Sequence, residues 1–222
     1  MQPGFNRLAD ATGAGNKAKL QLSIVALGHV HAEDLAALTP HFQRIEQLVL
    51  EIAPREPLAR HRAEFNRALD AATSDWILIV RERETVDDAL AAEIVAAAEG
   101  AKARGFRIRS VPFYAGEPLR IGEPENEVRL FHRRYYLRFA NKGEWDELMI
   151  QGAVVRLTSV FRSVTFDSVA AHREHLVAHA TKVSAVRRAL VFLRYLIATR
   201  TLDRNTLRYL WTEAGFVMPS VV

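Results

Sequence analysis

The chain has 222 residues, 49% of them hydrophobic and 25% charged, so it can bury a substantial core without the help of disulfides or a structural metal. It contains no cysteine, which excludes disulfides and thiolate chemistry. The net charge of +4 suggests contact with anionic groups such as phosphates or acidic lipids.

The two ends of the chain differ from its middle. Residues 1–18 are polar and glycine-containing, with no charged cap followed by an apolar stretch, so they indicate a flexible leader and not a secretory signal. No apolar run is long enough to span a bilayer. We therefore expect a cytoplasmic protein with one domain over residues 19–160 and a C-terminal helical segment over residues 161–222.

Short apolar runs alternate with amphipathic stretches through the first half of the chain. The runs predict strands at 20–27, 45–52 and 76–80, and the first and third of these are expected to be buried. The stretches predict helices at 32–42, 58–72 and from 86 to Gly100 or Gly105. Thr85 is the predicted N-cap of the last helix, with Asp88 at the capping-box position. This alternation is typical of a parallel sheet covered on both faces.

After Gly105 the pattern changes to short strand candidates separated by glycine and proline. These candidates lie at 106–114, 118–121, 127–132 and 149–158. From 168 to 212 the chain has neither glycine nor proline and is helical in character. We predict an α/β fold with a mixed, mainly parallel sheet, helices on both faces, and helices at the C-terminus.

Three motifs stand in a particular order. A helix carrying Asn66 precedes the Trp-Ile-Leu-Ile-Val strand at 76–80, which leads into Arg-Glu-Arg-Glu at 81–84. Residues 127–133 then read Glu-Val-Arg-Leu-Phe-His-Arg, and 144–148 read Glu-Trp-Asp-Glu-Leu. Over about residues 22–157 this order resembles the family 2 glycosyltransferases that build bacterial lipopolysaccharide and other surface glycans. The resemblance implies a nucleotide-sugar (GT-A) fold, a nucleotide-sugar donor and a glycan acceptor.

The chain departs from the family pattern at the metal site. In the family, Asp-x-Asp-Glu holds a Mg²⁺ or Mn²⁺ that bridges the donor diphosphate. Here Arg81 and Arg83 replace both aspartates, while Glu84 remains. A guanidinium has no lone pair to offer a metal, so we expect no metal cofactor.

The nucleoside pocket also differs from the family pattern. Glu51 stands where the family usually has a nucleoside-contacting Asp. The short connection from Glu51 to Asn66 suggests that a strand usual in the family is missing, together with part of this pocket. If the resemblance holds, Asn66 faces the nucleotide; otherwise it is an ordinary polar position on a helix.

Arg81 and Arg83 allow two interpretations. At i and i+2 of one strand they would share a face, with Glu82 and Glu84 on the other. They could then clamp a diphosphate directly through bidentate hydrogen bonds and support a metal-independent transferase. Alternatively the metal site is lost, the arginines pair with Glu82, Glu84 or a helix carboxylate, and the chain is an inactive relative that binds a glycan or a protein.

Glu147 is the candidate base that would deprotonate an acceptor hydroxyl, because the resemblance places the family Glu there. The family His beside it is Asp146 in this chain, and an Asp-Glu pair before an apolar strand is also typical of an exposed turn. With Glu147 as the candidate base, the predicted donor site is made of Glu51, Asn66, Arg81, Arg83 and Glu84.

Two further patterns lie in the C-terminal segment. His172, His175 and His179 have the helical spacing of a metal site, but no accompanying motif, and the alternative is a water-facing row. Basic residues alternating with leucines between 182 and 208 suggest peripheral contact with the inner membrane face, or a helix that packs its leucines on the domain. We expect no nucleic-acid partner, since no reader motif is present.

Overall fold

A computed structural model describes residues 20–51, 61–100, 103–120, 125–142, 145–178 and 203–213. Its main sheet contains β1 (Gln21–Leu27), β2 (Arg44–Leu50), β3 (Trp76–Arg81), β4 (Glu84–Thr85), β5 (Gly105–Tyr114), β6 (Glu117–Pro118), β7 (Glu125–His132) and β10 (Val154–Phe166). A separate hairpin is formed by β8 (Tyr136–Lys142) and β9 (Trp145–Ile150). The helices are η1 (Ala32–Leu38), α1 (Arg62–Ala71), α2 (Asp88–Gly100), η3 (Arg133–Tyr135), α3 (Val169–Ala178) and α5 (Arg204–Glu213).

The main sheet is mixed, with the order β2-β1-β3-β7-β5-β10-β4 and with β6 pairing to β5. The pairs β1–β2, β1–β3 and β5–β10 are parallel, whereas β7 runs antiparallel to both β3 and β5. Five long strands therefore point the same way, and β7 lies reversed among them. This confirms the predicted α/β class and the mixed sheet.

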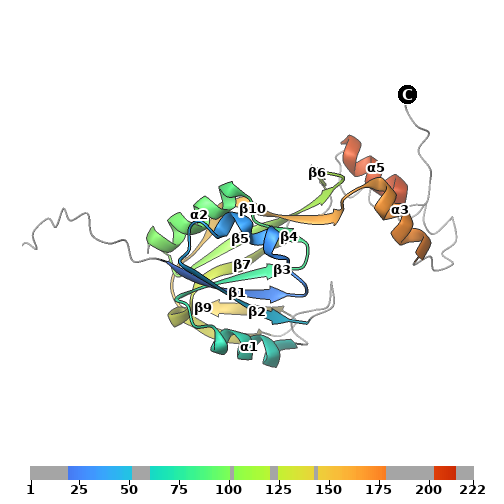
Figure 1. The fold of residues 1–222 in the computed structure, drawn as a ribbon. Helices are drawn as coiled ribbons and strands as arrows, with labels where there is room; N and C mark the ends of the chain where they lie inside the picture. The colour runs from blue at the N-terminus through green and yellow to red at the C-terminus, as the bar shows by residue number, and fades with distance from the viewer. Residues whose placement is uncertain are drawn as a thin grey trace, which may run out of the picture.

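Each face of the sheet has its own apolar core, because side chains alternate along a strand. On β1, Leu22 and Ile24 pack with residues of η1 and α2, whereas Val25 and Leu27 pack with residues of α1. We call these the α2-side core and the α1-side core. Figure 1 shows α2 and α1 on opposite sides of the sheet, so the prediction of helices on both faces is also confirmed.

Two predictions near α2 are wrong. Thr85 is not its N-cap, because Thr85 belongs to β4 and pairs with Arg162 of β10. The side chain of Asp87 takes that role and accepts a 2.9 Å hydrogen bond from the backbone N–H of Leu90. The helix expected at 32–42 is shorter and tighter, a 3-10 helix ending at Leu38.

The strand predicted at 149–158 is in fact the end of one strand and the start of another. Gly152, at a φ of 120°, lies in the turn between β9 and β10. A Cβ there would meet the side chain of Arg104 at 2.9 Å, which explains the need for glycine. The expected boundary at residue 160 falls inside β10, and β8 was not predicted.

The helices α3 and α5 pack against the ends of β5 and β10, away from α1 and α2 (Figure 1). Their junction is aromatic: the ring of His172 stacks on Phe166 at 4.2 Å and on Tyr209 at 5.3 Å between centroids. Its Nδ1 lies 3.3 Å from the hydroxyl of Tyr114. His172 is buried and so does not face water, which corrects that expectation; His175 is exposed, and His179 lies outside the described residues.

The carboxylate of Glu93 connects α2 to an irregular part of β10. Its two oxygens accept hydrogen bonds of 2.8 and 2.7 Å from the backbone N–H groups of Thr158 and Ser159. The pairing of β10 with β5 shifts register between Arg156 and Val160, which spans these amides. Burial raises the pKa of Glu93, but the hydrogen bonds from Thr158 and Ser159 outweigh it and bring the pKa below the usual 4.5.

We expect Glu93→Gln to destabilise the protein at pH 7 and to have a smaller effect in acid. A lowered folded-state pKa means that the charged Glu93 stabilises the fold above about pH 4.5, and that this contribution is lost as the pH falls through the folded pKa. Urea unfolding at pH 7 and pH 3 measures the difference, with exposed Glu99→Gln of the same helix as the control. An equal loss of stability at both pH values would contradict the role of the charge.

Candidate functional site

Three parallel strands end together at one edge of the sheet. Leu27 of β1 is the lateral neighbour of both Leu50 and Arg81, the last residues of β2 and β3. The backbone continues this alignment past the strands, because Gly28 N–H donates to the carbonyl of Leu50 and Glu82 N–H to that of Leu27, each at 2.8 Å. Ligands of open α/β sheets bind outside the carboxyl ends of such strands, so this edge is the candidate site.

The chain turns sharply directly after β3. Glu82 and Arg83 form the turn, and Arg83 has a left-handed φ of 65°, which is unusual for a residue with a Cβ. The backbone N–H of Arg81 donates to Oε2 of Glu84 at 2.8 Å and closes the turn. The prediction that Arg81 and Arg83 share a strand face is therefore wrong. The strand stops at Arg81 because β4 must leave β3 to pair with β10.

Glu84 is buried in an ion pair. Its Oε1 accepts a 2.8 Å hydrogen bond from Nη2 of Arg129, and the two side chains are 2% and 1% exposed. Arg129 is the extra residue of β7 at a register shift, and its guanidinium also lies 5.5 Å from the centre of the Phe161 ring. Both oxygens of Glu84 thus have partners within the fold.

Arg81 has its own carboxylate. Its Nη2 lies 3.0 and 2.9 Å from the two oxygens of Glu127, which also lies 3.3 Å from Nε of Arg129. Burial, followed by repulsion from Arg129, lowers the pKa of Arg81, while Glu127 and Glu84 oppose this change. We call Arg81, Glu84, Glu127 and Arg129 the strand-end network; two positive and two negative charges make it neutral.

Arg83 does not join this network. Its Nη1 donates to the carbonyl of Thr165 on β10 at 3.1 Å, and its Nε lies 3.9 Å from a carboxylate oxygen of Glu82. Both arginines are therefore engaged by groups of the chain itself, as the second interpretation expects. The partner of Arg81 differs from that interpretation, because Glu127 belongs to a strand and was not among the named carboxylates.

The residues of the strand-end network do not fit a divalent cation. Arg81 cannot ligate, and the oxygens of Glu84 accept hydrogen bonds from Arg129 and from the backbone of Arg81. Across the described ranges of the chain, no group of three or more His, Asp or Glu side chains is arranged to hold a metal ion.

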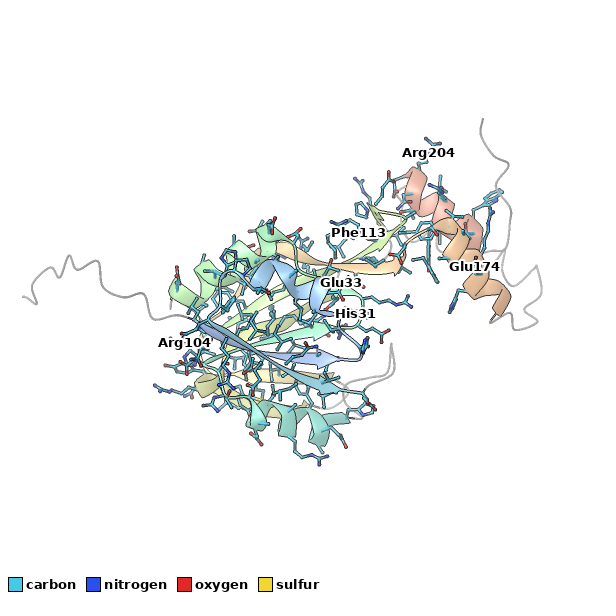
Figure 2. All side chains as sticks on the ribbon, viewed as in Figure 1. His31, Glu33, Arg104, Phe113, Glu174 and Arg204 are labelled. Atoms are coloured by element: carbon cyan, nitrogen blue, oxygen red, sulfur yellow. The ribbon has the colours of Figure 1, made fainter. Side chains whose placement is uncertain are left out.

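The other predicted site residues are spread over the fold. Glu51 follows β2 at the candidate edge and is exposed. Figure 2 shows His31 nearby, on the segment that follows β1. Asn66 is half-buried on α1. Glu147 lies in β9, where its backbone pairs with Ala140, and not in the exposed turn that was one of its interpretations.

Sequence reasoning missed the roles of Glu127 and Arg129. Both lie in the Glu-Val-Arg-Leu-Phe motif, which was used only as a mark of resemblance. A charged residue within an apolar strand needs a partner when it is buried, and the Arg-Glu-Arg-Glu stretch after β3 offered candidates of both signs. The opposite charges in these two motifs were therefore the feature of the sequence from which the pairing of Arg129 and Glu127 with residues 81–84 could have been predicted.

A small open hollow of about 300 Å³ lies at the other end of β3, and it was not predicted. Its lining mixes both charge signs and consists of Leu69, Asp70, Asp75, Arg133, Arg134 and Tyr136. Several of these polar groups already have partners in the chain: the hydroxyl of Tyr136 donates to Asp70, and Arg133 donates to the carbonyl of Ala72. Because the hollow lies at the amino end of β3, it is separate from the candidate edge at the carboxyl end of that strand.

Most of the basic C-terminal stretch lies outside the described residues; Arg204 and Arg208 are on α5. Within the ranges that the structure describes, we find no helix long and apolar enough to cross a membrane. No protein-family model matches the chain, and no curated protein matches it either. The function is therefore inferred from the site residues and from the resemblance of the motifs.

Proposed function

We propose that the chain is a relative of the family 2 glycosyltransferases that has lost metal-assisted sugar transfer and acts as a binding module for a glycan or a protein. The motif resemblance supports the family assignment. The mixed sheet, with its reversed β7 among strands of one direction and helices on both faces, is compatible with a GT-A-like fold. Fold alone does not decide activity, which depends on the site.

The observation that carries the proposal is the neutral strand-end network. In the family this position holds two aspartates and a cation for the donor diphosphate. Here Glu127 engages the guanidinium of Arg81 at both carboxylate oxygens, and Glu84 is buried against Arg129. A diphosphate would therefore have to displace Glu127 from Arg81, and a cation would find no available carboxylate oxygen on Glu84.

The alternative is a transferase that works without metal, with Arg81 binding the diphosphate of the donor. It requires the Arg81–Glu127 pair to open. Because the two side chains are 31% and 48% exposed, the pair is accessible, and exposed pairs of this kind contribute little stability. Glu127→Gln separates the two functions, since it releases Arg81 without adding negative charge.

Thermal unfolding with millimolar nucleotide diphosphate sugars tests the proposal, with Mn²⁺ in one arm and a chelator in the other. We expect Mn²⁺ to add no donor-dependent stabilisation to the unmodified chain, and Glu127→Gln to yield no sugar transfer. The matched control is Glu64→Gln, an exposed carboxylate on α1. Donor binding that needs Mn²⁺, or release of nucleotide diphosphate by either protein, would contradict the proposal.

A further inference from the structure

The hollow at the amino end of β3 is lined by two side chains of opposite charge that do not pair with each other. Asp75 directly precedes β3, and Arg134 belongs to η3. In the described part of the chain, neither side chain takes part in a hydrogen bond or an ion pair. One carboxylate and one guanidinium are therefore available to a ligand in the same hollow.

The backbone that carries these two side chains is held in place by hydrogen bonds. Trp76 pairs with His132 where β3 and β7 run antiparallel. Just beyond that pair, the backbone N–H of Arg133 donates to the carbonyl of Asp75 at 2.7 Å. The backbone N–H of Arg134 donates to Nδ1 of His132 at 3.3 Å. The start of β3 and the turn of η3 are thus fastened to each other.

The remaining polar side chains of the hollow make contacts that build its walls. Asp70 of α1 accepts a hydrogen bond from the hydroxyl of Tyr136 on β8. Arg133 donates through Nη1 to the carbonyl of Ala72, at the end of α1, at 2.8 Å. These contacts attach η3 and β8 to α1, so the hollow is formed before any ligand enters it.

The electrostatic influence of both free side chains reaches one ring, that of His132. Burial lowers the pKa of His132, and the negative charge of Asp75 opposes this change. The positive charges of Arg134, Arg104 and Arg133 lower the pKa of His132 further. Asp75 and Arg134 are therefore close enough to the same group for a small molecule to contact both of them.

The mixture of charges indicates the class of ligand. A metal ion would meet the positive charge of Arg134, and a simple anion would meet the negative charge of Asp75. A molecule with an ammonium group and a carboxylate matches both, because the charge-assisted hydrogen bonds of each group are then satisfied. The volume of about 300 Å³ lies at the lower end of the range for small-molecule sites, which favours a compact ligand.

We propose that the hollow binds a free α-amino acid, with its ammonium group on Asp75 and its carboxylate on Arg134. Leu69 and Tyr136 are the uncharged lining residues, and they offer apolar contact to an uncharged side chain of the ligand. This site goes beyond the function proposed above and does not depend on it, because the hollow shares no residue with the strand-end network.

Calorimetric titration of the full chain with L-leucine and with glycine tests the proposal. Leucine carries both charges, whereas leucinamide lacks the carboxylate and N-acetylleucine lacks the ammonium group. We expect saturable binding of leucine, and affinities lower by about tenfold or more for the two derivatives, since each loses one charge-assisted contact. Absence of saturable binding by both leucine and glycine at millimolar concentration, or equal binding by the three leucine compounds, overturns the proposal.

Two exposed single variants assign each charge of the ligand to its residue. We expect Asp75→Asn to weaken the binding of leucine but not that of N-acetylleucine, which has no ammonium group to lose. We expect Arg134→Gln to weaken the binding of leucine but not that of leucinamide. The matched controls are Glu64→Gln and Arg67→Gln, which make the same changes of charge at exposed positions of α1. Variants that bind leucine as the controls do overturn the proposal.

A neutral sugar separates this site from the glycan site of the proposed function. Glucose forms hydrogen bonds but carries no charge, so we expect it to bind in the hollow more weakly than leucine. Glucose that binds more tightly than leucine, and that loses this binding in Asp75→Asn, overturns the proposal and assigns the hollow to a glycan.

Discussion

Replacing Glu84 by Gln is expected to lower the free energy of unfolding by about 3–5 kcal/mol. The substitution keeps the shape of the side chain but removes the charge that lies 2.8 Å from the guanidinium of Arg129, which is 1% exposed and retains the 3.3 Å contact of its Nε with the partly exposed Glu127. A buried charge that loses its closest and most buried partner is among the costliest defects that a single substitution can introduce. Urea unfolding followed by circular dichroism measures the loss.

The double variant Glu84→Gln and Arg129→Met separates the ion pair from the shape of the site. Removing both charges leaves no buried ion, so we expect the double variant to recover most of the stability that Glu84→Gln loses. The control is Glu82→Gln in the same turn, whose carboxylate is half-buried and makes only a 3.9 Å contact with Arg83. Additive losses in the double variant would mean that Glu84 and Arg129 are not coupled.

The second large effect is expected for Phe65→Ala, with a loss of about 3–5 kcal/mol. Phe65 is 0% exposed and holds α1 on the α1-side core, where Leu69 packs one turn later. Its truncation leaves a cavity under the helix that carries Asn66. The midpoint of urea unfolding measures the loss. The control is Arg67→Ala at an exposed position of the same helix, which should change the midpoint little. A loss below 1 kcal/mol would show that α1 contributes little to the fold.

Much of the first half of the fold could be predicted from the sequence, because periodicity reports which faces are buried. The apolar runs of β1 and β3 and the helical spacing of Phe65 and Leu69 mark residues that lie in the two cores. The errors lie where long-range pairing overrides local preference. Thr85 has the chemistry of an N-cap, but its backbone pairs with Arg162, which is 77 residues away in sequence.

The candidate site could be predicted less well than the fold. The position of Arg81 at the end of a strand was predictable from its neighbours, since an apolar run ends there. Its ion pair with Glu127 was not, because that contact depends on β7 lying reversed beside β3 and on the register shift at Arg129. The alternating charges of Arg-Glu-Arg-Glu suggest that the two arginines share one face of a strand. The backbone of Arg83 is instead left-handed, so the strand does not continue through it.

Because β4 pairs with β10, the two sides of the main sheet differ in how far the hydrogen-bonding groups of their outer long strands are paired. At Arg162 and Ser163 the hydrogen-bonding groups of β10 are occupied by a two-residue strand that extends from the middle of the same sheet. Among the described residues, β2 pairs only with β1, and Val49 on it is 55% exposed. We therefore expect a second copy of this chain to pair with β2 more readily than with β10, and the exposed charge of Arg44 at the start of β2 to oppose such pairing.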